Sequence, residues 1–195
     1  MNDKLAWYIA RGSGLVAWAL LAAAVLWGLL LASGMVPRRP KRAWWLDLHR
    51  FLGGTAVAFT VVHVAALVGD SYATFGPVEI LVPLASHWRP WPVAAGVVTV
   101  YLLVSVELTS LLLPRVPHPI WRTVHYLSFP LFALATWHLV GAGTDAAGWP
   151  VRVVVLATCA AIVFLTVMRV LTPKKGRPAA APERSAEPRG PAPVA

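Results

Sequence analysis

The stretch that decides the fold runs from residue 46 to residue 67 and reads LDLHRFLGGTAVAFTVVHVAAL. Almost every residue after Arg50 is apolar, and the run is long enough to cross a bilayer, which takes about 20 helical residues. Two histidines, His49 and His63, interrupt it. Burying a polar imidazole among apolar side chains is unfavourable unless the ring finds a partner. The sequence therefore predicts a membrane helix whose two histidines need a partner.

The whole chain has the composition of an integral membrane protein. Of its 195 residues, 58% are hydrophobic and only 13% are charged, and the mean hydropathy is +0.66. Soluble domains carry about 25% charged residues. The net charge of +9 could indicate nucleic-acid binding, but the basic residues cluster in loops and no nucleic-acid motif accompanies them. We therefore expect a protein embedded in the lipid bilayer, with no nucleic-acid partner.

Charges and prolines divide the chain into five predicted spanning helices. Runs of about 20 residues with few or no charges predict the spans, and prolines mark their ends. The predicted ranges are about 13–34, 48–69, 91–113, 120–141 and 149–171. We therefore expect an all-α membrane domain of about five transmembrane helices over residues 1–171. Residues 172–195, rich in proline, alanine and arginine, are expected to form a disordered cytoplasmic tail.

Basic residues predict how the bundle is oriented. All but four of the 17 lysines and arginines fall in segments that would lie on one side of the membrane. The four on the other side are Lys4, Arg11, Arg89 and Arg152. Cytoplasmic loops of membrane proteins are enriched in lysine and arginine. We therefore expect a multi-pass cell-membrane protein with its N-terminus outside and its C-terminus in the cytoplasm.

The fourth predicted helix repeats the pattern of the second. Residues 121–140 read WRTVHYLSFPLFALATWHLV and contain His125 and His138. One helix lies between the two, so both run in the same direction, and His49 is expected at the depth of His125. His63 is expected at the depth of His138, about 21 Å further along a helix axis. Two facing imidazoles are a standard way to hold haem iron, and bundle interiors accommodate such cofactors.

This pattern leaves an alternative open. Each histidine could instead form a hydrogen bond to a neighbouring helix, which would make the protein a cofactor-free membrane scaffold. The two histidine spacings also differ in how far the helix turns between the histidines. On an ideal helix, His63 points to within about 40° of the direction of His49. His138 would point about 140° away from the direction of His125. A kink at Pro130 could correct this rotation.

The histidine spacing resembles the ferric reductase-like transmembrane domain. The resemblance rests on H-x13-H in one helix, H-x12-H in the next helix but one, and the motif RTVHYLSF. That superfamily includes NADPH oxidases, ferric reductases and the haem-bearing membrane subunit of the bacterial methionine sulfoxide reductase system. The resemblance covers roughly residues 7–171. It implies that the axial ligands of two b-type haem irons are His49, His63, His125 and His138.

The resemblance also implies a function in electron transport. The expected protein is an oxidoreductase component that passes single electrons from a cytoplasmic donor to an outer-side acceptor. Residues 172–195 are too few for the flavin and nicotinamide domains of many relatives, so the expected donor is a separate flavin reductase, a bound flavin or a quinone. Ferric iron, oxygen or a periplasmic enzyme could be the acceptor. The alternatives are a haem-binding sensor or assembly subunit without turnover, and the cofactor-free scaffold.

Four arginines are weaker candidates for the site. Arg50 and Arg122 flank the expected inner layer, and Arg11 and Arg89 flank the outer one. They could pair with haem propionates, or they could serve only to set the topology.

Five further residues are candidates for local roles. Gly53 and Gly54 follow His49 and could admit a flat ring or simply pack helices. Glu107 is an ionisable group within a predicted span and is expected to be a structural carboxylate or part of a proton path. His87 and His118 lie in predicted loops and are expected to be solvated.

Overall fold

The computed structural model describes residues 3–34, 42–69 and 75–172, and all the regular structure in these ranges is helical. The helices are α1 (Asp3–Ser33), α2 (Arg42–Val68), α3 (Pro77–Leu81), α4 (Pro90–Leu111), α5 (His118–Tyr126), α6 (Ser128–Ala142), the 3-10 helix η1 (Thr144–Ala147) and α7 (Trp149–Leu171). The predicted all-α fold is thereby confirmed. The predicted disordered tail lies outside the described residues, apart from Thr172.

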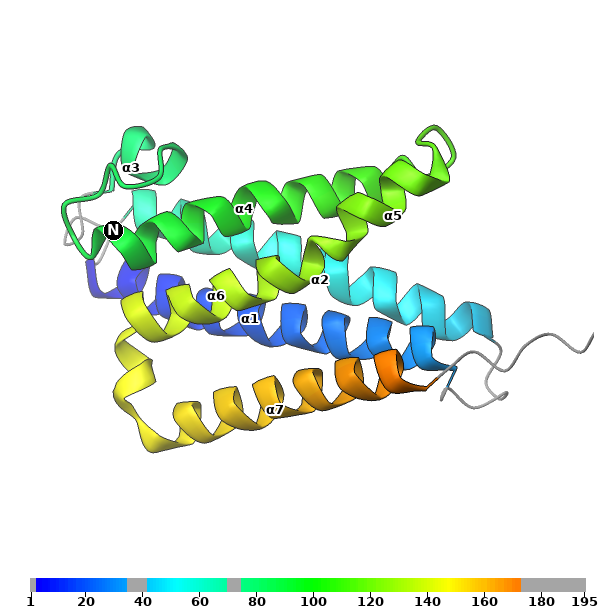
Figure 1. The fold of residues 1–195 in the computed structure, drawn as a ribbon. Helices are drawn as coiled ribbons and strands as arrows, with labels where there is room; N and C mark the ends of the chain where they lie inside the picture. The colour runs from blue at the N-terminus through cyan, green and yellow to red at the C-terminus, as the bar shows by residue number, and fades with distance from the viewer. Residues whose placement is uncertain (1–2, 35–41, 70–74, 173–195) are drawn as a thin grey trace, which may run out of the picture.

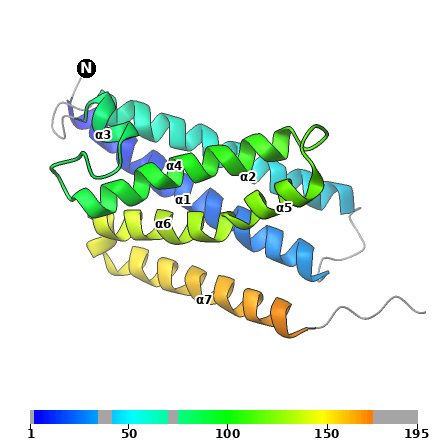
Figure 2. The ribbon, with the colours of Figure 1, turned by 45° about the horizontal axis from the view of Figure 1, so that its top comes forward.

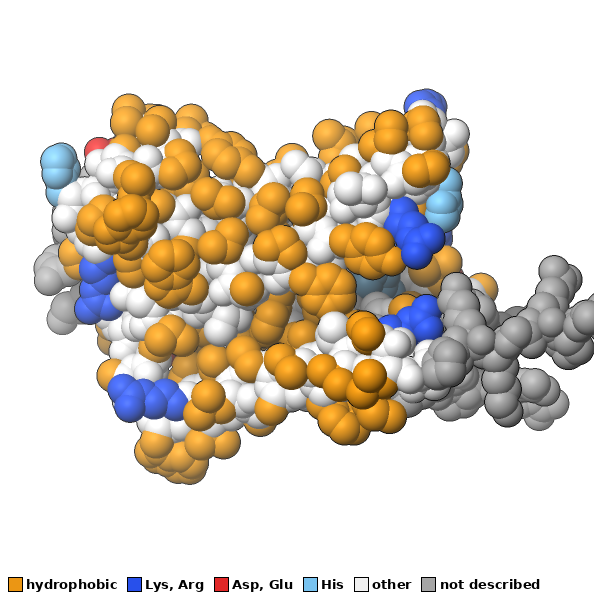
Figure 3. Space-filling model, in the orientation of Figure 1, with side chains coloured by type: hydrophobic (Ala, Val, Ile, Leu, Met, Phe, Trp, Pro, Cys, Tyr) orange, Lys and Arg blue, Asp and Glu red, His pale blue; other side chains and the backbone are white. Residues whose placement is uncertain are grey.

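Within the described ranges, four helices are long and apolar enough to cross a membrane: α1, α2, α4 and α7. The segment predicted as one further span, 120–141, forms α5 and α6 in succession, and each is shorter than a bilayer requires. On the face drawn in Figure 3, hydrophobic side chains cover the sides of the bundle, and lysine and arginine side chains lie toward its two ends. The chain is therefore a multi-pass membrane protein.

The long helices run back and forth along a common direction (Figure 1). α1 packs along α2, α4 packs along α6, and α7 lies against α1 at the edge of the bundle (Figure 2). One end of the bundle, here called the His63 end, holds the start of α1 and the ends of α2 and α6. The opposite end, the His49 end, holds the start of α2 and all of α5. α2 and the α5–α6 pair thus run in the same direction, as the sequence predicted.

Apolar side chains from α1, α4, α6 and α7 form the core between these two ends. Leu131 is its most enclosed large side chain, with 1% of its surface exposed. The rings of Trp18 and Phe132 lie 6.2 Å apart between centroids, and Nε1 of Trp18 donates to Oγ1 of Thr136 over 3.0 Å. Lipid is as apolar as these side chains, so close packing and interhelical hydrogen bonds of this kind hold the helices together.

Some predicted helix boundaries are wrong, and one of the errors is informative. A start at residue 13 treats Arg11 as a flanking charge, whereas α1 begins at Asp3 and contains Arg11. Both carboxylate oxygens of Asp145, in η1, accept hydrogen bonds from the Arg11 guanidinium. The distance from Nε of Arg11 to Oδ2 of Asp145 is 2.9 Å. The same guanidinium lies 4.1 Å from the ring centroid of Trp7. A charge with such partners does not have to end a membrane helix.

We expect the Arg11–Asp145 ion pair to stabilise the attachment of η1 to α1. In a double-mutant cycle of Arg11→Gln and Asp145→Asn, the coupling free energy should be about 1 kcal/mol, because the pair is bidentate but its side chains are still 31% and 24% exposed. Denaturant titration of the detergent-solubilised protein measures it. Strictly additive losses would show that the pair contributes no stability of its own.

Candidate functional site

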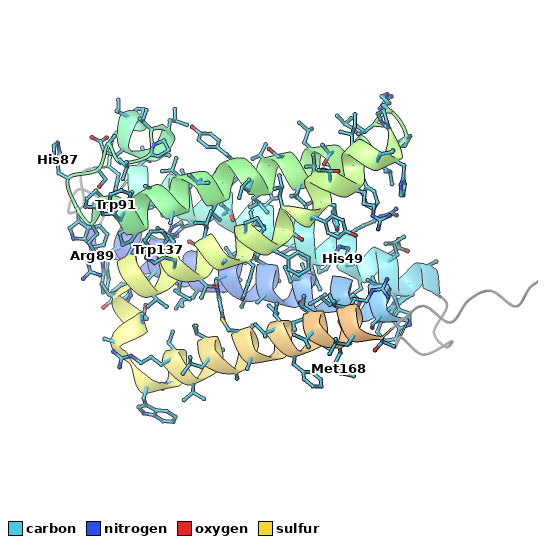
Figure 4. The ribbon with its side chains drawn as sticks, in the orientation of Figure 1. His49, His87, Arg89, Trp91, Trp137 and Met168 are labelled. Carbon is cyan, nitrogen blue, oxygen red and sulfur yellow. The ribbon has the colours of Figure 1, made fainter. Side chains whose placement is uncertain are left out.

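The four histidines of the two apolar segments form two pairs. The ring centroids of His49 on α2 and His125 on α5 lie 6.0 Å apart, with an angle of 68° between the ring planes. Those of His63 on α2 and His138 on α6 lie 6.2 Å apart, at 79°. All four side chains are half-buried. Figure 4 shows His49 within the bundle, toward the end opposite to His87, Arg89 and Trp91.

The break between α5 and α6 resolves the unequal rotation of His125 and His138. α5 ends at Tyr126, and the Leu127 N–H bonds to the carbonyl of Val124 over 2.9 Å, three residues back instead of four. Pro130 has no N–H to offer the carbonyl of Tyr126, and its ring crowds that carbonyl, so a continuous helix is unfavourable there. The two histidines therefore sit on separate helices and need not obey the rotation of a single one.

Three of the histidines are held by backbone carbonyls of neighbouring helices. The distances from Nδ1 to the carbonyl oxygen are 3.1 Å for His49 to Ala24 and 2.7 Å for His63 to Ala10, both on α1. The third is 2.8 Å, from His138 to Pro92 on α4. A carbonyl only accepts, so each Nδ1 donates its proton. The Nε2 atom of each neutral ring then keeps a free lone pair.

His125 is held differently. Its Nδ1 atom is buried and has no hydrogen-bond partner among the described residues. Its ring instead stacks on Trp121 one turn earlier, at 5.1 Å between centroids and 27° between planes. Nε1 of Trp121 in turn donates to Oγ of Ser110 on α4 over 3.3 Å. Aromatic stacking, not a backbone acceptor, therefore orients this fourth imidazole.

The two pairs fit a metal held between imidazoles within a porphyrin. An imidazole nitrogen lies about 2 Å from a bound transition metal, and the ring centre lies about 1 Å further on, so two opposed ligands place their centroids roughly 6 Å apart. Both observed separations have this value. In the described residues no three His, Cys, Asp or Glu side chains gather as a protein-only metal site requires. Haem iron needs only axial ligands from the protein.

Comparison with known proteins places the chain in a family. The family model described as "Ferric reductase like transmembrane component" matches residues 13–136. The chain belongs to this ferric reductase-like transmembrane family. The match includes His49, His63 and His125 and ends before His138. Comparison with curated proteins and with solved structures finds no match.

The four candidate arginines of this family member all have protein partners. At the His63 end, Arg11 is paired with Asp145, and Nη1 of Arg89 donates to the Gly141 carbonyl over 2.5 Å. At the His49 end, Nη1 of Arg50 lies 3.6 Å from Oδ1 of Asp47. The guanidinium of Arg122 donates to the Tyr126 hydroxyl. These four partnerships are Arg11–Asp145, Arg89–Gly141, Arg50–Asp47 and Arg122–Tyr126. Arg122 and His125 both line a cavity of about 270 Å³.

Gly53 and Glu107 meet each other and not a histidine. A Cβ atom at Gly53 would lie 2.3 Å from Oε1 of Glu107, whereas Gly54 has no neighbouring side chain within 4 Å. Glu107 forms no ion pair within the described ranges. His87 is exposed in the loop before α4, and His118, also exposed, is the first residue of α5. None of these five residues is a member of either histidine pair.

The sequence did not reveal the carbonyl acceptors of Ala10, Ala24 and Pro92. They are backbone atoms of helices without paired histidines, so no side chain at those positions announces them. Trp121 begins the stretch 121–140 quoted above, but its stacking on His125 could be recognised only once the start of α5 was known.

Proposed function

We propose that this protein is a di-haem b-type cytochrome that carries single electrons across the membrane. The observation that supports it is the presence of two imidazole pairs, at 6.0 and 6.2 Å between ring centroids, at the two ends of one bundle. His49 and His125 would hold one haem, and His63 and His138 the other. A bound haem supplies a one-electron iron couple whose potential the ligands and surroundings tune.

The chain's own part in this function is to orient ligands, offer a counter-charge and exclude water. The carbonyls of Ala10, Ala24 and Pro92 keep the protons of three rings on Nδ1, which leaves Nε2 for iron. Arg122 lies in the cavity beside His125, where it could neutralise an acidic group of the cofactor. The buried apolar cluster around Leu131 separates the two layers and keeps water out of the interior.

We further propose that electrons enter at the His49 end and leave at the His63 end. Arg50, Arg115, Arg122 and Arg169 lie at or near the His49 end, and cytoplasmic surfaces are enriched in such residues. The donor would be a flavin reductase or a quinone, and the acceptor would lie on the outer side. Membership of the ferric reductase-like family supports redox partners of this kind.

The cofactor-free scaffold remains the second candidate because three Nδ1 atoms already bond to neighbouring helices. A scaffold gives no role to the other nitrogen of each ring, since Nε2 of the four histidines makes no hydrogen bond in the described chain. In the described residues none of these four Nε2 atoms is buried without a partner, so each is open to a ligand beside its ring. An absorption spectrum of the purified protein separates the scaffold from the cytochrome, and reduction kinetics then separate an electron carrier from a sensor.

We expect the purified protein to bind two low-spin haems per chain, as pyridine haemochrome quantitation would measure. His49→Ala and His125→Ala should each remove the same haem, and the double mutant should be little worse than either single, because residues that share a partner do not act additively. His63→Ala should remove the other haem only.

Redox titration of the single mutants and the two within-pair doubles assigns each loss to a layer. Should His49→Ala and His138→Ala remove the same haem, the pairing is wrong. The absence of haem from wild-type protein would favour the scaffold.

We expect Pro130→Ala to disturb one layer. Alanine restores the N–H that the Tyr126 carbonyl lacks, so a continuous helix becomes favourable, and such a helix would turn His125 and His138 about 140° apart. Haem content should fall, with one spectral component lost. Pro119→Ala is the matched control, because Pro119 lies in the first turn of α5, where no N–H is needed. Unchanged haem in both variants would mean that Pro130 does not set the break.

We expect the C-terminus to be cytoplasmic. A reporter that is active only in the cytoplasm, fused to the C-terminus of the full chain, should be active, and one that requires export should not. The opposite result would reverse the assignment of the two ends and therefore the direction proposed for electron flow.

A further inference from the structure

Each carbonyl that holds a histidine is followed, four residues later on the same helix, by a glycine. The three pairs are Ala10 and Gly14, Ala24 and Gly28, and Pro92 and Gly96. In an α-helix, side chains lean toward the N-terminus, so the side chain at position i+4 covers the surface around the carbonyl of residue i. A glycine at i+4 leaves that carbonyl open to a ring from another helix.

The histidine rings occupy the space that a side chain at these glycines would take. A Cβ atom at Gly96 would lie 2.6 Å from Nδ1 of His138, and one at Gly14 would lie 2.9 Å from Nδ1 of His63. At Gly28 the nearest atom would be Cε1 of His49, at 3.2 Å. The first two distances are shorter than any van der Waals contact, so the ring would have to move. The third is tight and would displace the ring less.

α1 carries two of these glycines at the spacing of the two histidines of α2. Gly14 and Gly28 are separated by the same number of residues as His49 and His63, and the two helices pack antiparallel. Gly28 therefore meets His49, and Gly14 meets His63. α1 supplies none of the four paired histidines, yet it orients both of those on α2.

We propose that Gly14, Gly28 and Gly96 are positioning residues for the histidine pairs. Each exposes one backbone carbonyl, which fixes the proton of its histidine on Nδ1 and turns Nε2 toward the partner ring. The consequence for haem rests on the function proposed above; the consequence for the histidines does not. The His63–His138 layer is set by two such glycines, whereas the His49–His125 layer is set by one.

The test is alanine substitution in the full chain. Gly14→Ala and Gly96→Ala should each weaken haem binding in the His63–His138 layer about 10- to 100-fold, the usual effect of removing a group that orients a metal ligand. Gly28→Ala should act on the other layer, with a smaller effect. Haem content and redox titration assign each loss to a layer.

Gly12→Ala is the matched control, because a Cβ atom there meets nothing within 4 Å. Gly12 lies on α1, the same helix as Gly14 and Gly28. Alanine is a better helix former than glycine, so the control should be neutral or slightly stabilising. If Gly14→Ala weakens haem binding or lowers stability, helix propensity cannot be the cause, because propensity alone favours alanine. Equal behaviour of Gly14→Ala and Gly12→Ala would overturn the proposal.

Two measurements on haem-free protein keep this result separate from the proposed function. ¹⁵N NMR of histidine should show the Nδ1–H form for His63, and Gly14→Ala should abolish it. Thermal unfolding should show that Gly14→Ala lowers the midpoint in wild-type protein but not in a His63→Ala background, where the ring is gone. An unchanged His63 signal and equal losses in both backgrounds would refute the role of Gly14. A wild-type protein without haem would refute only the cytochrome.

Discussion

An imidazole brings two ring nitrogens into the bundle, and in a membrane both need a partner other than water. Three of the four paired histidines place Nδ1 on a backbone carbonyl of a neighbouring helix, which leaves Nε2 directed elsewhere. The packing of α1 on α2 and of α6 on α4 follows from this requirement, because the helices must approach until ring and carbonyl are within hydrogen-bond distance. The glycines of α1 and α4 permit that approach. The proposed cofactor site is therefore built into the helix contacts and is not a cavity added to them.

The two layers differ in how firmly they hold their rings. At the His63 end both imidazoles are anchored to carbonyls, on α1 and α4. At the His49 end only His49 is anchored, while His125 depends on stacking against Trp121. A hydrogen bond from Nδ1 makes an imidazole a stronger metal ligand. If each layer binds iron, the two irons have unequal ligand fields, which separates their potentials without any difference in ligand type.

Local periodicity predicted much of this fold but could not predict contacts between distant segments. The range 149–171 is confirmed as α7, and the count of spans was enough to predict that α2 and the α5–α6 segment run in parallel. The early start of α1 depends on Asp145, which is remote in the sequence. Pro130 marked a kink, but the end of α5 several residues earlier depends on which carbonyls lose their donor. The acceptor carbonyls carry no side-chain signal. The equal spacing of Gly14 and Gly28 could have revealed two of them.

The contact between α1 and α2 has a consequence for biogenesis. α1 and α2 leave the ribosome before the other described helices, and their antiparallel packing already contains both carbonyl bonds to His49 and His63. The amino-terminal hairpin can therefore mature, with two rings oriented, before α5 and α6 are synthesised. The partner histidines, His125 on α5 and His138 on α6, are synthesised later. A cofactor held by both rings of a pair could therefore bind only after α5 or α6 has been made, so the two oriented rings of the hairpin exist before either pair is complete.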